Sequence, residues 1–346
     1  IDNKICLTRD PFGIKPLYYT ILSNGVAFAS ELSCLVETGL TSRKINKHSL
    51  QELLQLQFTL GTDTIFSDIK RVSPGESIEF KDGLITQRSQ LPILPEEGPR
   101  NWTETEALNK LNRVLMDSVS MHQRSDVPYG MFLSGGVDSS VILACMRELN
   151  DTPVRAFSAG FSSNSVSDER AHAKYVAKAA GADFTSVEFS ENDFWNLTPE
   201  IVSRMDDPTA DYAILPTYKL AHAASISGLK VVLSGEGGDE LFAGYGRYRR
   251  HIRSALLGGR KMWSAGIFNK LDILHDQSEQ WKLKFNKAWE KENKAGRTKL
   301  QVAQAVDCAD WLPNDLLLKL DRCLMAHSVE GRTPLLDRRV ASIAMS

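Results

Sequence analysis

Hydrophobic residues recur at helical spacing in the stretch that follows residue 103. Thr103 is followed three residues later by Glu106, the arrangement of a capping box, in which each side chain bonds to the backbone of the other residue. The next apolar positions lie three or four residues apart and therefore share one face of a helix. A long amphipathic helix is predicted to begin here, with Ala107, Leu108, Leu111, Val114, Leu115 and Val119 on its apolar face.

Between residues 129 and 234, short apolar runs typical of strands alternate with longer runs of helical period. Such alternation is typical of a parallel sheet that is covered by helices on both faces, so an α/β fold with a doubly wound sheet is predicted. From residue 245 onward the pattern is charged and helical, and no further strand is expected. The predicted strands are residues 129–134, 154–158 and 230–234, and the predicted helices are residues 139–149, 168–180 and 215–227.

The first 88 residues mix short alternating stretches with one helical run. Residues 4–8 and 26–30 alternate as strands do, residues 47–57 have helical period, and Pro74-Gly75 predicts a turn. Residues 89–102 hold three of the 13 prolines without any apolar period and are predicted to be a linker. A length of 346 residues fits the resulting division into two domains, residues 1–88 and 103–346.

Composition restricts the classes of function. With 41 Lys and Arg against 43 Asp and Glu, the chain has no overall field for a nucleic acid or an anionic membrane. The basic run at residues 247–253 is interpreted as a solvated helix face. No apolar run approaches the roughly 18 residues of a membrane span, and the 5 cysteines have no CxxC spacing for zinc and indicate no disulfide framework. A cytoplasmic protein without nucleic-acid or membrane partners is expected.

Residues 134–140, Ser-Gly-Gly-Val-Asp-Ser-Ser, follow an apolar strand and open a helix. Backbone N–H groups and hydroxyls in such a loop can bind phosphates near the positive end of the helix dipole, and glycines let the chain pass close to the ligand. Asp138 would supply a carboxylate to Mg²⁺, an ion that is usually coordinated by one or two carboxylates together with substrate phosphates. Gly136-Val137 stands where a Walker motif needs Lys-Ser/Thr, so that motif is excluded, and a plain Gly-rich turn is the alternative.

Residues 234–245, Ser-Gly-Glu-Gly-Gly-Asp-Glu-Leu-Phe-Ala-Gly-Tyr, follow another predicted strand. Three acids close together repel one another unless a cation or a proton relieves them, so a metal ion or a positive substrate group is expected here, with a solvated acidic turn as the alternative. Residues 319–337 carry mixed charges, which alone would indicate a salt-bridged surface.

Together these segments resemble the asparagine synthetase family. Residues 134–140 match the pyrophosphate loop of the ATP pyrophosphatase (PP-loop) superfamily, and residues 234–245 and 319–337 are similar to two narrower motifs of asparagine synthetases. Cys323 stands where the family usually has Met, and Gly331 where it commonly has Ala or Val. Residues 156–161 resemble the family's second strand, and residues 206–211 resemble its Asp-rich segment with a central proline.

Residues 9–19 and 28–32 resemble the later half of the glutaminase domain of class II glutamine amidotransferases, an Ntn-hydrolase α+β domain. That family uses an N-terminal Cys as nucleophile, whereas this sequence begins with Ile1. It also stops at Ser346, before a lysine that the synthetase family places farther on. The resemblance therefore implies a chain cut at both ends, a partial glutaminase domain and an incomplete ATP-binding domain, and no glutaminase catalytic residue is assigned.

The resemblance implies ATP-dependent synthesis of asparagine from aspartate with ammonia derived from glutamine, through a β-aspartyl-adenylate and with release of AMP and pyrophosphate. ATP and Mg²⁺ are the implied cofactors, and a homodimer is an option. The implied site residues are Leu133, Ser134, Gly135, Gly136, Asp138, Ser139, Ser140, Ala159, Ser234 and Gly235 for ATP and pyrophosphate, Asp138 and Asp239 for Mg²⁺, Glu236 for catalysis on the incoming ammonia, and Asp321, Glu330 and Arg332 for the amino acid.

Three alternatives stay open at this point. The same adenylation could serve another carboxylic acid, because the phosphate loops are indifferent to the acyl group. A synthetase that closes a β-lactam ring would need no glutaminase, and the motif at residues 9–19 argues only weakly against it. A non-catalytic ATP-sensing module is disfavoured by the intact Asp138, Glu236 and Asp239.

Overall fold

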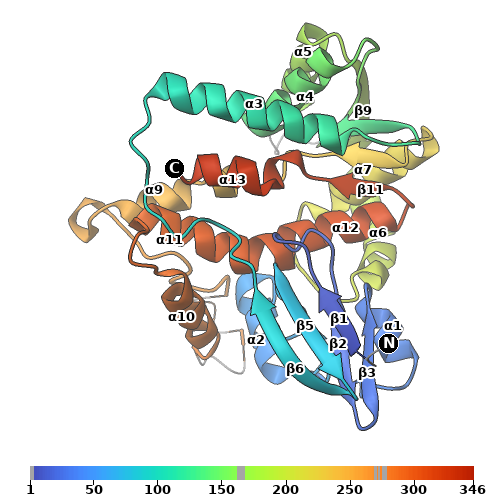
Figure 1. Ribbon diagram of the computed structural model, residues 1–346. Coiled ribbons are helices and arrows are strands. Elements are labelled where there is room, and N and C mark those ends of the chain that lie inside the picture. Colours follow the sequence, from blue (N-terminus) through green and yellow to red (C-terminus); the bar gives the residue numbers. More distant parts are fainter. Residues whose placement is uncertain (1–3, 162–167, 269–270, 272, 275–278) are drawn as a thin grey trace. The chain divides into compact units, whose positions relative to one another are not determined.

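Figure 1 shows the computed structural model of the chain, which describes residues 4–161, 168–268, 271, 273–274 and 279–346. Ile1, at which the sequence begins, lies outside the described residues. The chain forms two compact units, and neither is continuous in sequence. The first combines the residues up to Pro99 with Met205–Asp211 and Ala243–Leu318, and the second combines Arg100–Arg204, Tyr212–Phe242 and Lys319–Ser346.

The second unit contains a five-stranded sheet in which all neighbouring strands are parallel. From β7 the chain proceeds to β8 and β9 on one side and then returns to β10 and β11 on the other, so the order reverses between β7 and β10. This is a doubly wound sheet, and its switch point lies between those two strands. The strands are β7 (Tyr129–Phe132), β8 (Arg155–Phe161), β9 (Asp183–Phe189), β10 (Val231–Leu233) and β11 (Glu330–Arg332).

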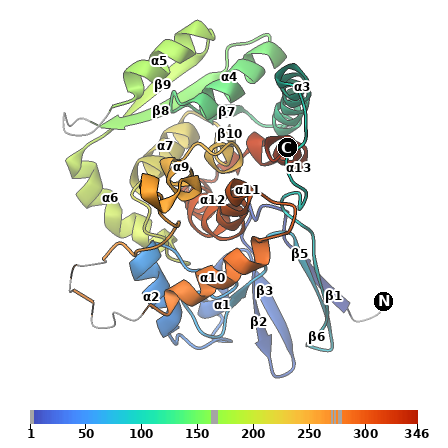
Figure 2. The ribbon, with the colours of Figure 1, turned by 90° about the vertical axis from the view of Figure 1, so that its left-hand side faces the viewer.

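Helices cover both faces of this sheet, as the alternating pattern predicts. On one face Met131 and Leu133 pack with apolar residues of α3, α4, α5 and α13, and on the other face Phe157 and Val232 pack with α7 and α12. Figure 2 shows α7 and α12 on one side of β7 and β10 and α3 and α4 on the other. The helices are α3 (Glu104–His122), α4 (Val137–Leu149), α5 (Arg170–Ala179), α6 (Glu191–Arg204), α7 (Ile214–Ile226), α8 (Gly238–Leu241), α12 (Leu317–Met325), η3 (Pro334–Leu336) and α13 (Arg338–Ala344).

The predicted elements of this unit are confirmed to within a few residues, and the capping box of Thr103 and Glu106 forms at the start of α3. The expectation that no strand follows residue 245 is wrong, because β11 pairs with β10. Its sequence, Glu-Gly-Arg, has no apolar pattern. Gly331 packs closely under α12, since a Cβ there would lie 3.0 Å from the Leu324 side chain. The strand β9 was not predicted either.

The first unit has two small antiparallel sheets, ordered β1-β5-β6 and β3-β2-β4, and a group of helices. The strands expected at residues 4–8 and 26–30, the helix at 47–57 and the turn at Gly75, whose φ is +70°, are all found. The elements are β1 (Lys4–Thr8), β2 (Tyr18–Leu22), β3 (Gly25–Ala29), α1 (Leu32–Glu37), α2 (Lys47–Leu56), β4 (Lys70–Arg71), β5 (Glu76–Lys81), β6 (Leu84–Gln90), α9 (Gly246–Ile252), η1 (Ala255–Leu257), α10 (Trp281–Glu292), α11 (Lys299–Val306) and the π-helix η2 (Asp307–Leu316).

Two segments of the first unit can be compared with the linker and the solvated helix face that the sequence predicts. The strand β6 extends to Gln90, and beyond it Arg297 donates hydrogen bonds to the carbonyl oxygens of Leu94 and Pro95. The expected solvated face at residues 247–253 is only partly right, because Arg247 forms an ion pair with the fully buried Asp307 at 2.8 Å. The boundaries 1–88, 89–102 and 103–346 stay predictions about domain families.

All five cysteines are free thiols, in agreement with the predicted lack of a disulfide framework. Within the described ranges, no helix combines the length and the apolar character that crossing a membrane requires.

A buried ion pair holds residues 205–211 within the first unit. The Asp207 carboxylate, which is 0% exposed, accepts hydrogen bonds from Arg71 at 2.7 Å and from the Tyr18 hydroxyl at 3.0 Å. Breaking such a pair leaves a buried charge without its partner, which is costly.

An Asp207→Asn variant is therefore expected to lower the free energy of unfolding by roughly 2 kcal/mol, because Arg71 loses its counter-charge while the side-chain shape is kept. Urea denaturation followed by circular dichroism measures the change. As a control, Glu37→Gln breaks the exposed pair with Arg43 and should cost less than about 0.5 kcal/mol. Equal effects of the two substitutions would contradict a stabilising role of the buried pair.

Candidate functional site

Two glycine-rich loops follow the strands at the switch point of the second unit. One connects β7 to α4 and contains residues 133–136, and the other connects β10 to α8 and contains residues 234–237. Because β7 and β10 are parallel neighbours, both loops leave the same edge of the sheet side by side. In doubly wound folds the crevice outside the carboxyl ends of the strands at this point is where ligands bind.

The first loop is held in shape by its own hydroxyls. Ser134 Oγ lies 3.0 Å from Ser139 Oγ and accepts a hydrogen bond from the Gly136 backbone N–H at 3.2 Å. The Ser140 hydroxyl donates to the Gly136 carbonyl oxygen at 2.7 Å. Gly136 is the N-cap of α4 and no side chain caps this end, so the first N–H groups of the helix are available to an anion.

Gly135 lets the first loop pass close to α5. Its φ is +82°, and a Cβ at this position would lie 3.0 Å from the Ala173 backbone N and from the His172 ring. A larger residue would be strained in its backbone and would push the loop away from the helix.

Glycines of the second loop and of the start of α8 pack directly against the first turn of α4, which holds Asp138. A Cβ at Gly238 would lie 2.2 Å from the Asp138 carboxyl carbon, and a Cβ at Gly235 would lie 3.0 Å from the Ser139 backbone N. Gly237, with φ +92°, has the left-handed conformation that turns the chain into α8. The two loops thus form one contiguous structure around the Asp138 side chain.

The surroundings of the Asp138 side chain disfavour its ionised form. Burial, together with the negative charges of Asp239 and Glu236, raises the pKa of Asp138 to about 6. Acids that repel one another in this way are relieved by a proton or a cation. The structure thus brings together Asp138, Asp239 and Glu236, as the motifs predict.

The donor set fits a magnesium ion that is shared with phosphates. In the part of the chain that the structure describes, no group of three or more His, Cys, Asp and Glu side chains could hold a metal by itself. Mg²⁺ does not require such a group, because it keeps several waters and is usually bound through one or two carboxylates plus substrate phosphates. Asp138 and Asp239 are the side chains that would hold it.

Two buried hydroxyls lie where neighbouring strands end, one at the start of the second loop and one after β11. Ser234 follows β10 and Thr333 follows β11, and neither hydroxyl oxygen has a hydrogen-bond partner among the described residues. Buried hydroxyls without partners are costly, which points to a ligand or water in this crevice. The sequence pattern carries no signal for Thr333, because β11, the strand that places it there, has no apolar pattern.

The residues predicted to surround the nucleotide base come from the strands themselves. Leu133 is 1% exposed, and its backbone N–H donates to the Phe157 carbonyl oxygen at 2.8 Å. Ala159 is half-buried in β8, next to Gly160, where a Cβ would clash with Asp168 and Arg170. The roles of Leu133, Ala159 and Gly235 around adenine and ribose stay predictions.

The three residues predicted to contact the amino acid have protein partners. Arg332 binds Glu330 at 2.9 Å and also donates to the carbonyl oxygens of His122 and Arg124, at the end of α3. Asp321 is buried in α12 and lies 3.6 Å from Arg322. These contacts link elements of the second unit, and a role toward the amino acid stays a prediction.

Comparison with known proteins bears on both parts of the chain. A family model described as Asparagine synthase matches residues 110–346, and one described as Glutamine amidotransferase domain matches residues 1–90. The chain is 33% identical over 382 residues to "Asparagine synthetase [glutamine-hydrolyzing] 1" of Bacillus subtilis, an alignment that covers 99% of this chain and 60% of that protein. The chain therefore spans less than two thirds of the length of this relative.

Two further matches are more distant. An amidase of Penicillium rubens is 28% identical over 264 residues, covering 71% of this chain and 38% of the amidase. A glutamine-dependent NAD+ synthetase from Acinetobacter baumannii, solved in complex with ADP, covers 80% of this chain and 55% of its own with 16% identity and a TM-score of 0.31, a likeness too low to carry an argument.

Proposed function

This chain belongs to the asparagine synthase family, and from that premise we propose that it converts aspartate to asparagine at the expense of ATP, releasing AMP and pyrophosphate. The observation that carries the proposal is the pair of loops at the sheet's switch point, which converge on Asp138. This crevice combines hydroxyls that can bind phosphate, an uncapped helix N-terminus and carboxylates that repel one another. Such a combination suits a nucleoside triphosphate bound with a divalent cation.

The first step proposed is attack of the aspartate β-carboxylate on the α-phosphorus of ATP. The bond from that phosphorus to the bridging oxygen of pyrophosphate breaks, so negative charge grows on the leaving group. The first N–H groups of α4, which no side chain caps, are already placed to donate to that charge, and the hydroxyls of Ser134, Ser139 and Ser140 would join them by exchanging their hydrogen bonds within the loop for bonds to the leaving group. Donors that are already fixed in position stabilise a transition state without having to reorganise.

Asp138 and Asp239 would hold Mg²⁺ beside the phosphates. When bound, the ion supplies positive charge that neutralises the phosphate oxygens. Gly235 and Gly238 keep the space around the Asp138 carboxylate free of side chains.

The second step proposed is attack of ammonia on the activated acyl carbon, with AMP as leaving group. The nitrogen must lose a proton as the amide forms. Glu236 is half-buried and close enough to Asp138 to raise the pKa of that carboxyl group, so it is the candidate to orient ammonia and accept this proton. We further propose that glutamine supplies the ammonia in the whole protein, since residues 1–90 match an amidotransferase domain.

A second candidate function is amide formation on another carboxylic acid. The match to the Penicillium amidase favours it, because members of this wider group carry other names than asparagine synthetase. The phosphate loops would serve either reaction, and only the acceptor pocket would differ.

The products distinguish these functions. With ATP, Mg²⁺ and ammonia, aspartate is expected to give AMP, pyrophosphate and asparagine, and without ammonia it should support exchange of labelled pyrophosphate into ATP. A panel of other carboxylic acids, assayed in parallel, tests the second candidate. Formation of ADP and phosphate would exclude the adenylate. Release of pyrophosphate at a rate that no carboxylic acid increases would contradict both proposed functions.

A further inference from the structure

On each of two opposite sides of α10, the described part of the first unit has a cavity. Lys284, Lys287 and Lys291 line a cavity of about 600 Å³, and Lys282, Phe285 and Trp289 line another of about 590 Å³. Both volumes lie within the roughly 300–1,000 Å³ that is usual for small-molecule sites. Neither cavity includes a residue of the two loops described above.

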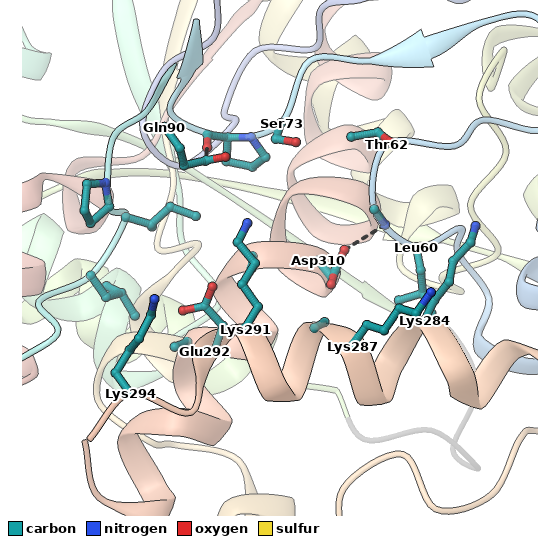
Figure 3. Close-up of a pocket in the computed structure, with 18 of the residues that line it drawn as sticks. Leu60, Thr62, Ser73, Gln90, Lys284, Lys287, Lys291, Glu292, Lys294 and Asp310 are labelled. Carbon is teal, nitrogen blue, oxygen red and sulfur yellow. Dashed lines mark hydrogen bonds between the residues drawn. The ribbon is translucent and has the colours of Figure 1, made fainter. Parts of the chain in front are cut away.

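Carboxylates balance most of the positive charge in the first cavity, which Figure 3 shows. Lys284 pairs with Asp63 at 2.7 Å and with Glu52 at 2.9 Å, and Arg297 pairs with Glu292 at 2.6 Å. Lys291 points from α10 toward the wall that holds Ser73 and Gln90 (Figure 3). With acids from several elements in its walls, this cavity does not select for one sign of charge.

Positive charge dominates the second cavity. Every charged residue that lines it within the described chain is a lysine, namely Lys261, Lys282 or Lys299, and no carboxylate is among the lining residues. Lys282 pairs with the exposed Glu279, whereas Lys261 and Lys299 have no carboxylate within 4 Å among the described residues. An anion in the cavity would therefore meet two cations that the described protein does not neutralise.

Aromatic rings form another wall of the second cavity. Trp289 lies with its ring centre 6.3 Å from that of Phe285, and the Trp263 ring centre lies 6.2 Å from that of Phe285. Trp263 has a φ of +51°, a strained conformation for a bulky residue, and its indole N–H donates to Asp307 at 3.2 Å. Trp263 and Trp289 are half-buried, so part of each indole ring stays open to a planar ligand, whereas Phe285 is 8% exposed and supports Trp289 from the core.

His251 lies between the charged and the aromatic parts of the second cavity. Its ring centre is 4.8 Å from that of Trp289, and its Nδ1 accepts a hydrogen bond from the Met262 backbone N–H at 3.4 Å. The neutral ring then carries its proton on Nε2, which can donate to a ligand. Burial and the nearby charges of Lys299 and Lys261 lower the pKa of His251, so both lysines act on the same part of the cavity.

We propose that this second cavity is a binding site for a small aromatic anion, a planar ring that carries a carboxylate or a phosphate. The ring packs against Trp263 and Trp289, and the anionic group lies beside His251 between Lys261 and Lys299. The site shares no residue with the loops of the ATP chemistry proposed above, because its residues belong to the first unit and the two loops belong to the second.

Calorimetric titration with indole-3-acetate and with its neutral analogue indole-3-acetamide tests the proposal. The acid should bind at one site per chain, and about tenfold more tightly than the amide, since only the acid forms charge-assisted bonds to the lysines. A Lys261→Gln/Lys299→Gln variant should lose this difference. Both lysines are exposed, so the variant keeps its fold, which thermal melting verifies.

The matched control is Lys287→Gln/Lys291→Gln, which removes two lysines from the other side of the same helix and should leave the affinity for indole-3-acetate within about twofold. Displacement of indole-3-acetate by AMP would identify a phosphate as the natural anionic group, and displacement by benzoate but not by AMP would identify a carboxylate. Equal binding of acid and amide, equal losses in the two double variants, or displacement by inorganic phosphate alone would each overturn the proposal.

Discussion

An Asp138→Asn variant is expected to lose about a thousandfold in the rate of pyrophosphate release, and yet to melt at a higher temperature than the parent protein. The activity falls because a neutral amide at this position cannot bind Mg²⁺ as a carboxylate does. The stability rises because the ionised carboxylate is half-buried, and this burial, together with the charges of Asp239 and Glu236, raises its pKa to about 6. An amide of the same shape has no charge to desolvate.

The gain in stability of Asp138→Asn over the parent protein should increase as the pH rises. Since the pKa of Asp138 in the folded protein, about 6, is above its ordinary value of 3.8, the folded state favours the protonated form. The carboxylate therefore destabilises the parent increasingly as the pH rises from about 4 to about 6, and by a constant amount above that range. The melting temperatures of parent and variant should converge below about pH 4 and differ most at neutral pH.

Magnesium adds a readout that does not depend on turnover. The ion should raise the melting temperature of the parent at pH 7, because it relieves the repulsion between the carboxylates, and it should have little effect on Asp138→Asn. Asp151→Asn changes an exposed aspartate and serves as the control in both experiments. A variant that loses activity and also melts lower at neutral pH would contradict the electrostatic argument.

The site's loops could be predicted from sequence because their signals are local. Ser134, Gly136 and Ser140 bond to one another within seven residues, and the strand before them and the helix after them are read from the same stretch. The capping box at Thr103 is equally local. Where hydrogen bonds connect near neighbours in sequence, pattern and structure agree.

Other features depend on contacts between distant residues, and the pattern did not indicate them. The strand β11 forms by pairing with the edge of β10 and lies under Leu324, although its three residues are not apolar. Thr333 and its buried hydroxyl were missed for the same reason.

The discontinuous composition of the two units also depends on contacts between residues that are distant in sequence. Asp207 is 136 residues from Arg71, and Arg247 is 60 residues from Asp307, yet each pair is joined in the interior of the first unit. In the sequence these residues look like parts of an acidic turn and a basic surface helix. Only the burial of Asp207 and Asp307 shows that these charged side chains form ion pairs inside the unit.

Substitution of Gly238 by Ala is expected to slow pyrophosphate release by about a hundredfold while the melting temperature changes little. The new Cβ would lie 2.2 Å from the Asp138 carboxyl carbon and 2.4 and 2.5 Å from its oxygens. These atoms are the end of a side chain that can rotate, so the fold tolerates the change. The carboxylate, however, would leave the position from which it reaches the metal and the phosphates.

A matched control is available in the same chain, because a Cβ at Gly246 would have no atom within 4 Å, so Gly246→Ala should leave the rate unchanged and should not lower the melting temperature. Steady-state rates at saturating ATP and Mg²⁺, with melting curves for both variants, measure the two effects. If the position of Asp138 governs the reaction, Gly238→Ala combined with Asp138→Asn should be no slower than Asp138→Asn alone, since the alanine acts only by displacing that carboxylate. Additive losses in the double variant would show that Gly238 has a separate role.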